Sequence, residues 1–433
     1  MDGTPDIADG ERPPEEHFVD RVVASAHAVQ TTEDIRTPSG IKLLAKGAKV
    51  TAEVRERLLA HKLAKPLEQT VEVADAVAGE TLSRVAQELF DRQPLLGRLH
   101  GRASTIGATL GRLPLTGQLR SLLTLYTELS PDRLAHCVGV ALFATGIAGE
   151  VLTYDESNVR AFLTAGLFHD IGELYVDPAV LKSDAPLEPA HWKHIVSHPV
   201  IGHRVLHDMD GAGRVVADAI LHHHERRDGF GYPKRLLGDA LPVRGEVLAA
   251  AEWLVGMMRH GRSPLTSASA AARLMPGGFR DSIIRAVTSA GPANSSQGAD
   301  TARSSKLLER LTRVTGTVRN FRESRPWIQR LIESRSGASA VVAANHGRME
   351  LIECSLARSG LLVDDAAQLF ERLAPVDDPD LLAELEAVVK EVGWRLRELE
   401  RDTLLRATTL APADQGIVRE LVTRLKTQTV EHD

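Results

Sequence analysis

Cysteine, aromatic residues and long apolar runs are all scarce in this chain. The two cysteines, Cys137 and Cys354, are too few for a disulfide framework, which fits a reducing cytoplasm. Aromatic residues make up 4% of the sequence, while Leu, Ala, Arg and Glu abound, and that composition favours helices. We find no apolar run approaching the roughly 20 residues that cross a bilayer, and the acidic, Pro-rich N-terminus is unlike a signal peptide. We therefore expect a cytoplasmic protein with no membrane partner.

A strong excess of one charge is also missing. The formal net charge is −6 at pH 7 and the isoelectric point is about 6.3, with acidic and basic residues interspersed. Surfaces that bind nucleic acid normally gather basic residues, so we expect no nucleic-acid partner. The length of 433 residues allows two or three domains, each with a core of its own.

Composition and periodicity predict a mainly α fold. The expected segments are a disordered tail (1–16), a small α+β module with connecting helices (17–128), a helical metal-binding core domain (129–287), a linker (288–305) and a helical C-terminal region (306–433). In the α+β module, apolar stretches at 22–29 and 41–44 flank a turn at 37–40 and suggest a hairpin. Thr51 is expected to cap the helix that follows.

The C-terminal region contains an apolar seam from Leu382 to Leu399. Its members alternate in steps of three and four, as in a coiled coil, with charges between them. The seam predicts either a helix packed within the C-terminal region or a coiled coil that joins two subunits into a homodimer.

Histidines and carboxylates are concentrated between residues 130 and 260. They occur as His169-Asp170, as His198 before Pro199, and as the run 222–225, which leads into a Gly-Tyr-Pro turn. Neutral imidazole and carboxylate are ligands of divalent metals. Predicted helices place each group near a helix end or on an inner face, which suits a metal site in a helical bundle.

At these residues the chain resembles the HD-GYP family, the bacterial branch of the HD metal-dependent phosphohydrolases. The second half of the family's double motif is complete from His223 to Pro233, and the first half is present as His169-Asp170 followed by Gly172. The resemblance covers roughly residues 130–260. It implies a metal-dependent phosphodiesterase that hydrolyses cyclic di-GMP in bacterial second-messenger signalling, with a pair of divalent cations, iron or manganese.

The resemblance also implies a set of metal ligands. They are His136, His169, Asp170, His198, His223, His224 and Glu252. Asp170 is the expected bridging and catalytic group, since a carboxylate has two oxygens and phosphodiester hydrolysis uses a metal pair about 3.5–4 Å apart. Asp132, one turn before His136, is either a further ligand or a charge that favours the helix start. His222 is the spare histidine of the run.

The segment after the histidines is expected to bind substrate. Its residues with this role are Asp228, Gly229, Gly231, Tyr232 and Pro233. The glycines permit positive φ and the proline stiffens the exit, so the same residues could form only a tight structural turn. By resemblance the loop lies beside the nucleotide pocket, where Tyr232 could stack on a base, and it touches partner domains such as a cyclic di-GMP synthase.

Four positions depart from the family pattern. Glu173 takes the place of a lysine near the phosphate, Glu246 of an arginine, Val255 of an aspartate, and Glu252 of a metal-binding aspartate. One unit charge about 5 Å away at an effective dielectric near 20 is worth roughly 3 kcal/mol, so the change at the lysine position weakens phosphate binding if that side chain faces the site. If it faces outward, it pairs with a surface cation such as Arg204 or Lys182.

Three functions therefore remain open from the sequence. The first is the cyclic di-GMP phosphodiesterase, with Asp170 and Glu173 as the catalytic candidates. The second is a degenerate relative that binds a nucleotide or a partner protein without turnover. The third is a phosphohydrolase of another nucleotide.

Overall fold

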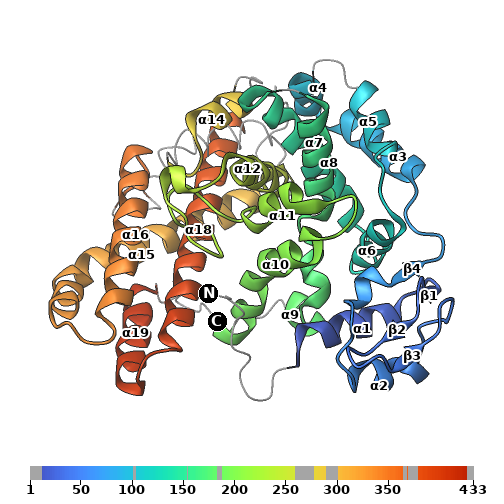
Figure 1. The fold of residues 1–433 in the computed structure, drawn as a ribbon. Helices are drawn as coiled ribbons and strands as arrows, with labels where there is room; N and C mark the ends of the chain where they lie inside the picture. The colour runs from blue at the N-terminus through green and yellow to red at the C-terminus, as the bar shows by residue number, and fades with distance from the viewer. Residues whose placement is uncertain are drawn as a thin grey trace. The chain divides into compact units, whose positions relative to one another are not determined.

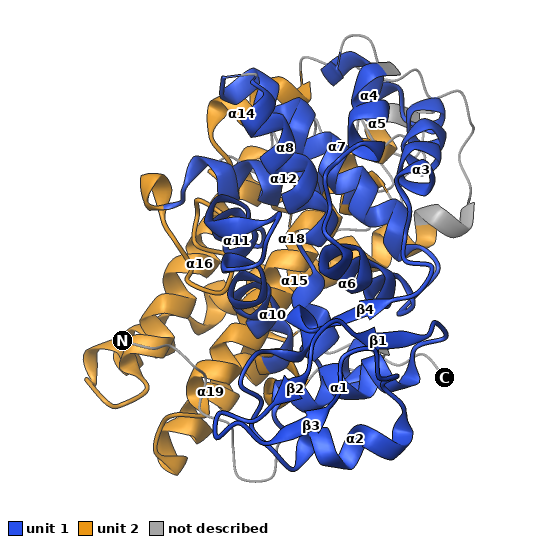
Figure 2. Cartoon of the chain, turned by 45° about the vertical axis from the view of Figure 1, so that its right-hand side comes forward, with its two compact units in different colours: residues 1–184, 194–225, 241–255 blue, residues 185–193, 226–240, 256–433 orange. Residues whose placement is uncertain are grey.

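The computed structural model of the chain is mainly α-helical, with four short strands near the N-terminus (Figure 1). It describes residues 12–100, 104–153, 155–182, 188–258, 277–288, 301–363, 368 and 379–426. These residues divide into two compact units (Figure 2). Unit 1 comprises residues 1–184, 194–225 and 241–255, and unit 2 comprises residues 185–193, 226–240 and 256–433. The units cut across the predicted segment boundaries, because the Gly-Tyr-Pro loop groups with the C-terminal helices.

The N-terminal part of unit 1 is the expected small α+β module. Its elements are α1 (Pro14–Ala24), β1 (Val29–Thr31), β2 (Ile35–Arg36), β3 (Lys42–Leu44), α2 (Ala52–Leu59), η1 (Leu67–Gln69) and β4 (Val71–Val73). A hairpin forms around the predicted turn as the antiparallel pair β2–β3, whereas β1 pairs with β4. Its first strand is 35–36 and not the predicted stretch 22–29, because Val22 lies in α1 and faces the core. Thr51 is the N-cap residue of α2, but its side chain makes no capping hydrogen bond.

The predicted tail ends earlier than expected. Residues 1–11 lie outside the described part, but α1 begins at Pro14, where proline suits the first helical turn. Phe18 of α1 stacks on Tyr175 with ring centroids 4.8 Å apart, so this helix packs against the segment that follows the His-Asp pair.

Helices form the rest of unit 1, as expected. They are α3 (Gly79–Arg92), α4 (Pro94–His100), α5 (Ser104–Gly111), α6 (Gly117–Thr127), α7 (Arg133–Val151), α8 (Glu156–Phe168), η2 (Ile171–Tyr175), α9 (Pro178–Lys182), α10 (Pro189–His207, of which 194–207 belong here), α11 (Gly213–Leu221) and α12 (Val243–Met258, up to Val255). By length and composition α7 could cross a membrane, contrary to the expectation from the sequence, but 72% of its apolar stretch is buried, as in the core helix of a soluble protein.

Helix α10 continues through Pro199. Proline in a helix interior normally costs about 3 kcal/mol because it removes a hydrogen bond and crowds the preceding turn. Here the helix passes through it with His198 in its middle, buried to 2% exposure.

Four long helices make up most of unit 2. They are α15 (Thr301–Glu333), α16 (Ser339–Arg358), α18 (Pro379–Ala407) and α19 (Pro412–Leu425); the shorter η3 (Gly238–Ala240) and α14 (Asp281–Thr288) belong to the same unit. Most of the predicted linker, residues 289–300, lies outside the described part, and its last residues belong to α15, which begins at Thr301. Seam residues Leu385, Val389 and Val392 are buried in the core of these helices. These seam residues are therefore packed within the chain, as the packed-helix alternative expects, and a coiled coil between two subunits stays a prediction.

Candidate metal centre

The His-Asp pair sits at the end of a capped, buried helix. Asp155 caps α8 by accepting a hydrogen bond from the backbone of Asn158, and the helix ends at Phe168 with His169 as its C-cap. Gly172 follows in η2, where a side chain would overlap the backbone carbonyl of His198. This glycine thus lets α10 approach the pair closely and bring His198 to it.

The expected ligands converge as two groups. The first contains Asp170, His198, His223 and His224, and the second contains His136, His169 and Glu252. Within each group the potential ligand atoms lie within 4.8 Å of one another. All seven predicted ligands are therefore brought together, and they come from α7, the end of α8, α10, the segment after α11, and α12.

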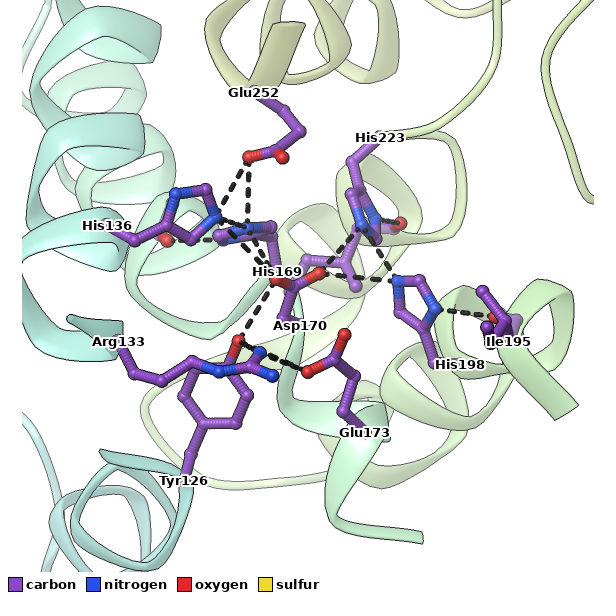
Figure 3. A network of polar contacts seen from close by, with 12 residues as sticks. Tyr126, Arg133, His136, His169, Asp170, Glu173, Ile195, His198, His223 and Glu252 are labelled. Carbon is purple, nitrogen blue, oxygen red and sulfur yellow. Dashed lines mark hydrogen bonds and ion pairs between the residues drawn. The ribbon is translucent and has the colours of Figure 1, made fainter. Parts of the chain in front are cut away.

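Asp170 lies between the two groups (Figure 3). Its Oδ1 is 3.3 Å from Nε2 of His198 and 3.3 Å from Nε2 of His223. Its Oδ2 is 3.2 Å from Nε2 of His169 and 3.7 Å from Nε2 of His136. Each carboxylate oxygen thus faces a different set of imidazoles, which is the geometry that a bridging ligand requires.

The imidazoles are oriented by the backbone. Nδ1 of His169, His198 and His223 lies 2.8, 2.6 and 2.6 Å from the carbonyl oxygens of residues 166, 195 and 220 respectively. A carbonyl only accepts, so each Nδ1 carries the hydrogen and each Nε2 lone pair points into the site. Two pairs of Nε2 atoms then face one another at 3.1 Å, His136 with His169 and His198 with His223. Each pair of nitrogens can share a proton, and a divalent cation can take the place of that proton, so the donor set fits a metal pair.

The electrostatics of the site also favour positive charge. Burial lowers the pKa of His169, but the carboxylates of Asp170 and Glu252 raise it well above its ordinary value. Burial would raise the pKa of Asp170, but His169, His136 and His198 hold it well below its ordinary range. Burial and neighbouring imidazoles lower the pKa of His224. The carboxylates thus remain ionised, and a divalent cation bound by the same atoms displaces protons from the imidazoles.

Two site residues were missed by the sequence analysis. Tyr126 of α6 donates its hydroxyl to Oδ2 of Asp170 at 3.0 Å, and its oxygen accepts from the guanidinium of Arg133, which also pairs with Glu173. Arg133 stands one turn before His136 on α7, a helical spacing that could have indicated it. Tyr126 carried no such signal, because it occupies an ordinary buried position of a predicted helix.

Glu173 therefore points inward. Its side chain is 16% exposed and pairs with Arg133, whereas Arg204 pairs with Glu15. Burial and the charge of Asp170 raise the pKa of Glu173, and Arg133 opposes this shift. The outward alternative with Arg204 is thus wrong, and the glutamate at the lysine position neutralises the nearest arginine.

The remaining candidates lie outside the two ligand groups. Asp132 is the N-cap residue of α7. His222 packs against Gly245, and its Nδ1 lies 2.7 Å from the carbonyl oxygen of Asp218. Glu246 is fully buried near the start of α12, and Val255 is buried against Gly139 of α7. The positions that lost their family residues are thus packed into the protein interior.

The Gly-Tyr-Pro loop is held by the C-terminal helices of unit 2. Asp228 forms an ion pair of 2.9 Å with Arg395 of α18, and the side chains are 8% and 3% exposed. Arg348 of α16 donates to the carbonyl of Gly229 at 2.8 Å. Phe230 is buried in the core of the same helices. Three successive motif residues are therefore engaged within the chain.

Gly229 and Tyr232 also have structural roles. Gly229 has the predicted positive φ, 75°. Tyr232 is 8% exposed and packs edge-on against Trp192, with ring centroids 5.4 Å apart. The Tyr232–Pro233 peptide bond is cis. Substrate binding by Asp228, Gly231 and the others remains a prediction.

A helical bundle whose His-Asp pair bridges two groups of imidazoles and carboxylates defines an HD-type metal-binding domain. The comparison with known families agrees, because the HD domain model matches residues 133–257. Residues 133–257 thus match the HD domain family.

Its relatives are bacterial phosphodiesterases. The chain is 32% identical over 125 residues to the cyclic di-GMP phosphodiesterase response regulator RpfG of Xanthomonas campestris, covering 28% of this chain and 30% of that protein. It is 36% identical over 114 residues to the cyclic di-GMP phosphodiesterase PA4108 of Pseudomonas aeruginosa, covering 26% and 28%. It is 25% identical over 196 residues to the 3'3'-cGAMP-specific phosphodiesterase 3 of Vibrio cholerae, covering 44% and 39%. The match thus spans well under half the length of each relative.

Proposed function

We propose that this chain is a metal-dependent phosphodiesterase of the HD type that hydrolyses cyclic di-GMP. The observation that carries the proposal is the position of Asp170, whose two oxygens face two separate groups of ligands. A site built only for folding, or for a single cation, has no need of this arrangement. The similarity to cyclic dinucleotide phosphodiesterases supports the same class of substrate. Iron or manganese is the expected metal, and the cytoplasm the expected location.

The residues of the chain have distinct parts in this proposal. When bound, a divalent metal pair supplies a strong nucleophile from water and stabilises the charge that develops on the phosphate. His136, His169 and Glu252 would hold one cation, and His198, His223 and His224 would hold the other. Asp170 would serve both, and the hydroxyl of Tyr126 donates a hydrogen bond to its Oδ2.

A specific observation favours the second candidate, nucleotide or partner binding without turnover. The guanidinium of Arg133 lies beside Asp170 and could neutralise a substrate phosphate, but it is paired with Glu173. Released from that pair, Arg133 would supply the cation that the missing lysine otherwise provides. The balance between the two candidates therefore depends on one ion pair.

Metal counting tests the site independently of turnover. Protein purified anaerobically and loaded with manganese or ferrous iron should contain two equivalents of metal. Asp170→Asn should lose both, because Asp170 faces both groups, whereas Glu252→Gln should lose one, because Glu252 belongs to one group. His207→Ala, at a half-buried histidine that pairs with Asp208 and lies outside the two ligand groups, is the matched control and should retain both. Wild-type metal content in Asp170→Asn would contradict the bridging role.

A turnover panel tests the substrate. Cyclic di-GMP, 3'3'-cGAMP and common mononucleotides are incubated with the metal-loaded protein, and the linear dinucleotide and mononucleotide products are separated by chromatography. The proposal expects cyclic di-GMP to be consumed fastest. Consumption of a different nucleotide in preference would support the third candidate, and metal loading without any turnover would support the second.

A further inference from the structure

A cationic cavity lies on unit 2, formed by residues that no motif includes. Its volume is about 440 Å³. The lining residues come from the end of α12, from α15 and from α18, and those that the argument uses are Arg310, Arg313, Lys390, Gly393 and Arg397. Cavities that hold small molecules have volumes of roughly 300–1,000 Å³. This one has a suitable size for a mononucleotide.

The charges around the cavity are unbalanced. Four cations line it, and Glu386 is the one carboxylate among its lining residues. Arg313 pairs with Glu309, and Lys390 donates to the carbonyl of Gly256 at 3.1 Å. In the described part of the chain, neither Arg310 nor Arg397 has an ion-pair partner. Charges of like sign repel, and an anion bound among these side chains would offset that repulsion.

The titration of two lining residues is consistent with this repulsion. Burial lowers the pKa of Lys390; Glu386 and Glu391 oppose this shift, and the charges of Arg310 and Arg397 add to it. Burial and repulsion from Arg401, Arg310 and Arg313 also lower the pKa of Arg397, and Glu398 opposes that shift. Both residues therefore gain from an anion placed between them.

Gly393 is a second feature of this cavity that suggests a bound ligand. It lies inside the 29-residue helix α18, where glycine costs about 1 kcal/mol relative to alanine. Packing does not require it, because an added Cβ would meet only the guanidinium of Arg397 at 3.5 Å, an ordinary contact. The position lines the cavity, so the missing side chain leaves room for an occupant at its wall.

The rest of the lining is apolar. Met257, Val314, Ala387 and Val389 contribute it, and all four are buried. Guanidinium groups bind phosphate oxygens in pairs of hydrogen bonds, and an apolar wall accepts a flat ring. We propose that this cavity is a second ligand site, separate from the metal centre, that binds a nucleoside polyphosphate through Arg310, Arg397 and Lys390.

The test uses the full-length protein and GTP, ATP and pyrophosphate as probes, with guanosine as the uncharged control. Isothermal titration calorimetry in magnesium-free buffer should show one equivalent of GTP or ATP bound, weaker binding of pyrophosphate and none of guanosine. Affinity should fall as salt rises. Binding should persist in Asp170→Asn, which separates this site from the metal centre.

Substitutions identify the residues responsible. Arg310→Ala and Arg397→Ala should each weaken binding about ten-fold or more, since each removes charge-assisted hydrogen bonds. Gly393→Leu should block the cavity while leaving α18 intact, since leucine is a good helix former. Arg319→Ala, at an exposed arginine of α15 outside the cavity, is the matched control and should bind as wild type does.

Three results would overturn the proposal. The first is that the wild-type protein binds none of the three phosphate probes. The second is that Arg310→Ala and Gly393→Leu bind GTP or ATP as tightly as the wild type does. The third is that Asp170→Asn loses this binding. None of them bears on the metal count or the turnover panel, so failure here leaves the proposed function standing.

Discussion

The ion pair between Arg395 and Asp228 should contribute strongly to the packing of the Gly-Tyr-Pro loop against the C-terminal helices. The two charges are 2.9 Å apart and nearly fully buried. At an effective dielectric near 20, their attraction is at most about 6 kcal/mol, and part of it offsets the cost of desolvating both groups. Removing one partner of such a pair typically costs about 3–5 kcal/mol, because the other is left buried without compensation.

The structure predicts an asymmetry between the two partners. Arg395 also pairs with Glu391 at 3.2 Å. Arg395→Met therefore leaves two buried carboxylates without this cation and should lower the free energy of unfolding by about 3–5 kcal/mol. Asp228→Asn leaves Arg395 paired with Glu391 and should cost less, about 1–3 kcal/mol. The double variant should cost less than the sum of the two.

Urea unfolding followed by circular dichroism measures these differences. Arg424→Met is the control, since Arg424 pairs with Glu420 on the surface of α19 and should contribute no more than about 1 kcal/mol. Metal content is measured in the same samples, because the loop begins two residues after His224. The reasoning fails if Arg395→Met costs no more than the control, or if Asp228→Asn costs more than Arg395→Met.

Three other outcomes are expected. Glu173→Gln should free Arg133 from its ion pair and strengthen cyclic di-GMP binding, measured by calorimetry, about ten-fold at low salt and less at high salt. Glu173→Lys should increase the binding affinity by less than its change of charge suggests, because it places a second cation beside Arg133. Burial raises the pKa of Glu398 from 4.5 to about 7, so the folded state holds this proton more tightly than the unfolded state does. The free energy of unfolding should therefore fall by up to roughly 3 kcal/mol as pH rises from about 4.5 to above 7. Glu398→Gln should flatten that dependence in urea titrations at several pH values. Manganese at 100 times its dissociation constant should stabilise the protein by about 2.7 kcal/mol, and chelation or Asp170→Asn should abolish the gain in thermal melts.

Much of the fold was predictable because it depends on local patterns. Composition and periodicity indicated that residues 129–287 are helical, and the turn at residues 37–40 indicated where the β2–β3 hairpin reverses. Errors occurred where tertiary packing overrides a local signal. Pro199 is a strong helix breaker by itself, yet α10 continues through it. Val22 belongs to an apolar stretch that could form a strand, but it is the buried face of α1.

The metal ligands could be identified from the sequence because ligand chemistry limits the residue types and the motif keeps them in order. His169 and Asp170 are adjacent in any fold, and so are His223 and His224. Sequence also indicated that Glu173 occupies a position where charge matters. It could not say which way that side chain points, since this depends on Arg133, forty residues earlier in the chain.

Only the tertiary structure decided how these groups combine. A carboxylate can bridge two cations only if imidazoles face each of its oxygens, and the meeting of α7, α8, α10, the segment after α11 and α12 brings that about at Asp170. The tertiary structure also determined the environment of the Gly-Tyr-Pro loop. The sequence predicts that Asp228 binds substrate, but in the structure Asp228 forms a buried ion pair with Arg395, 167 positions later. A contact between residues so far apart in the chain leaves no local sequence pattern, because the helix or loop around each partner can form without the other partner.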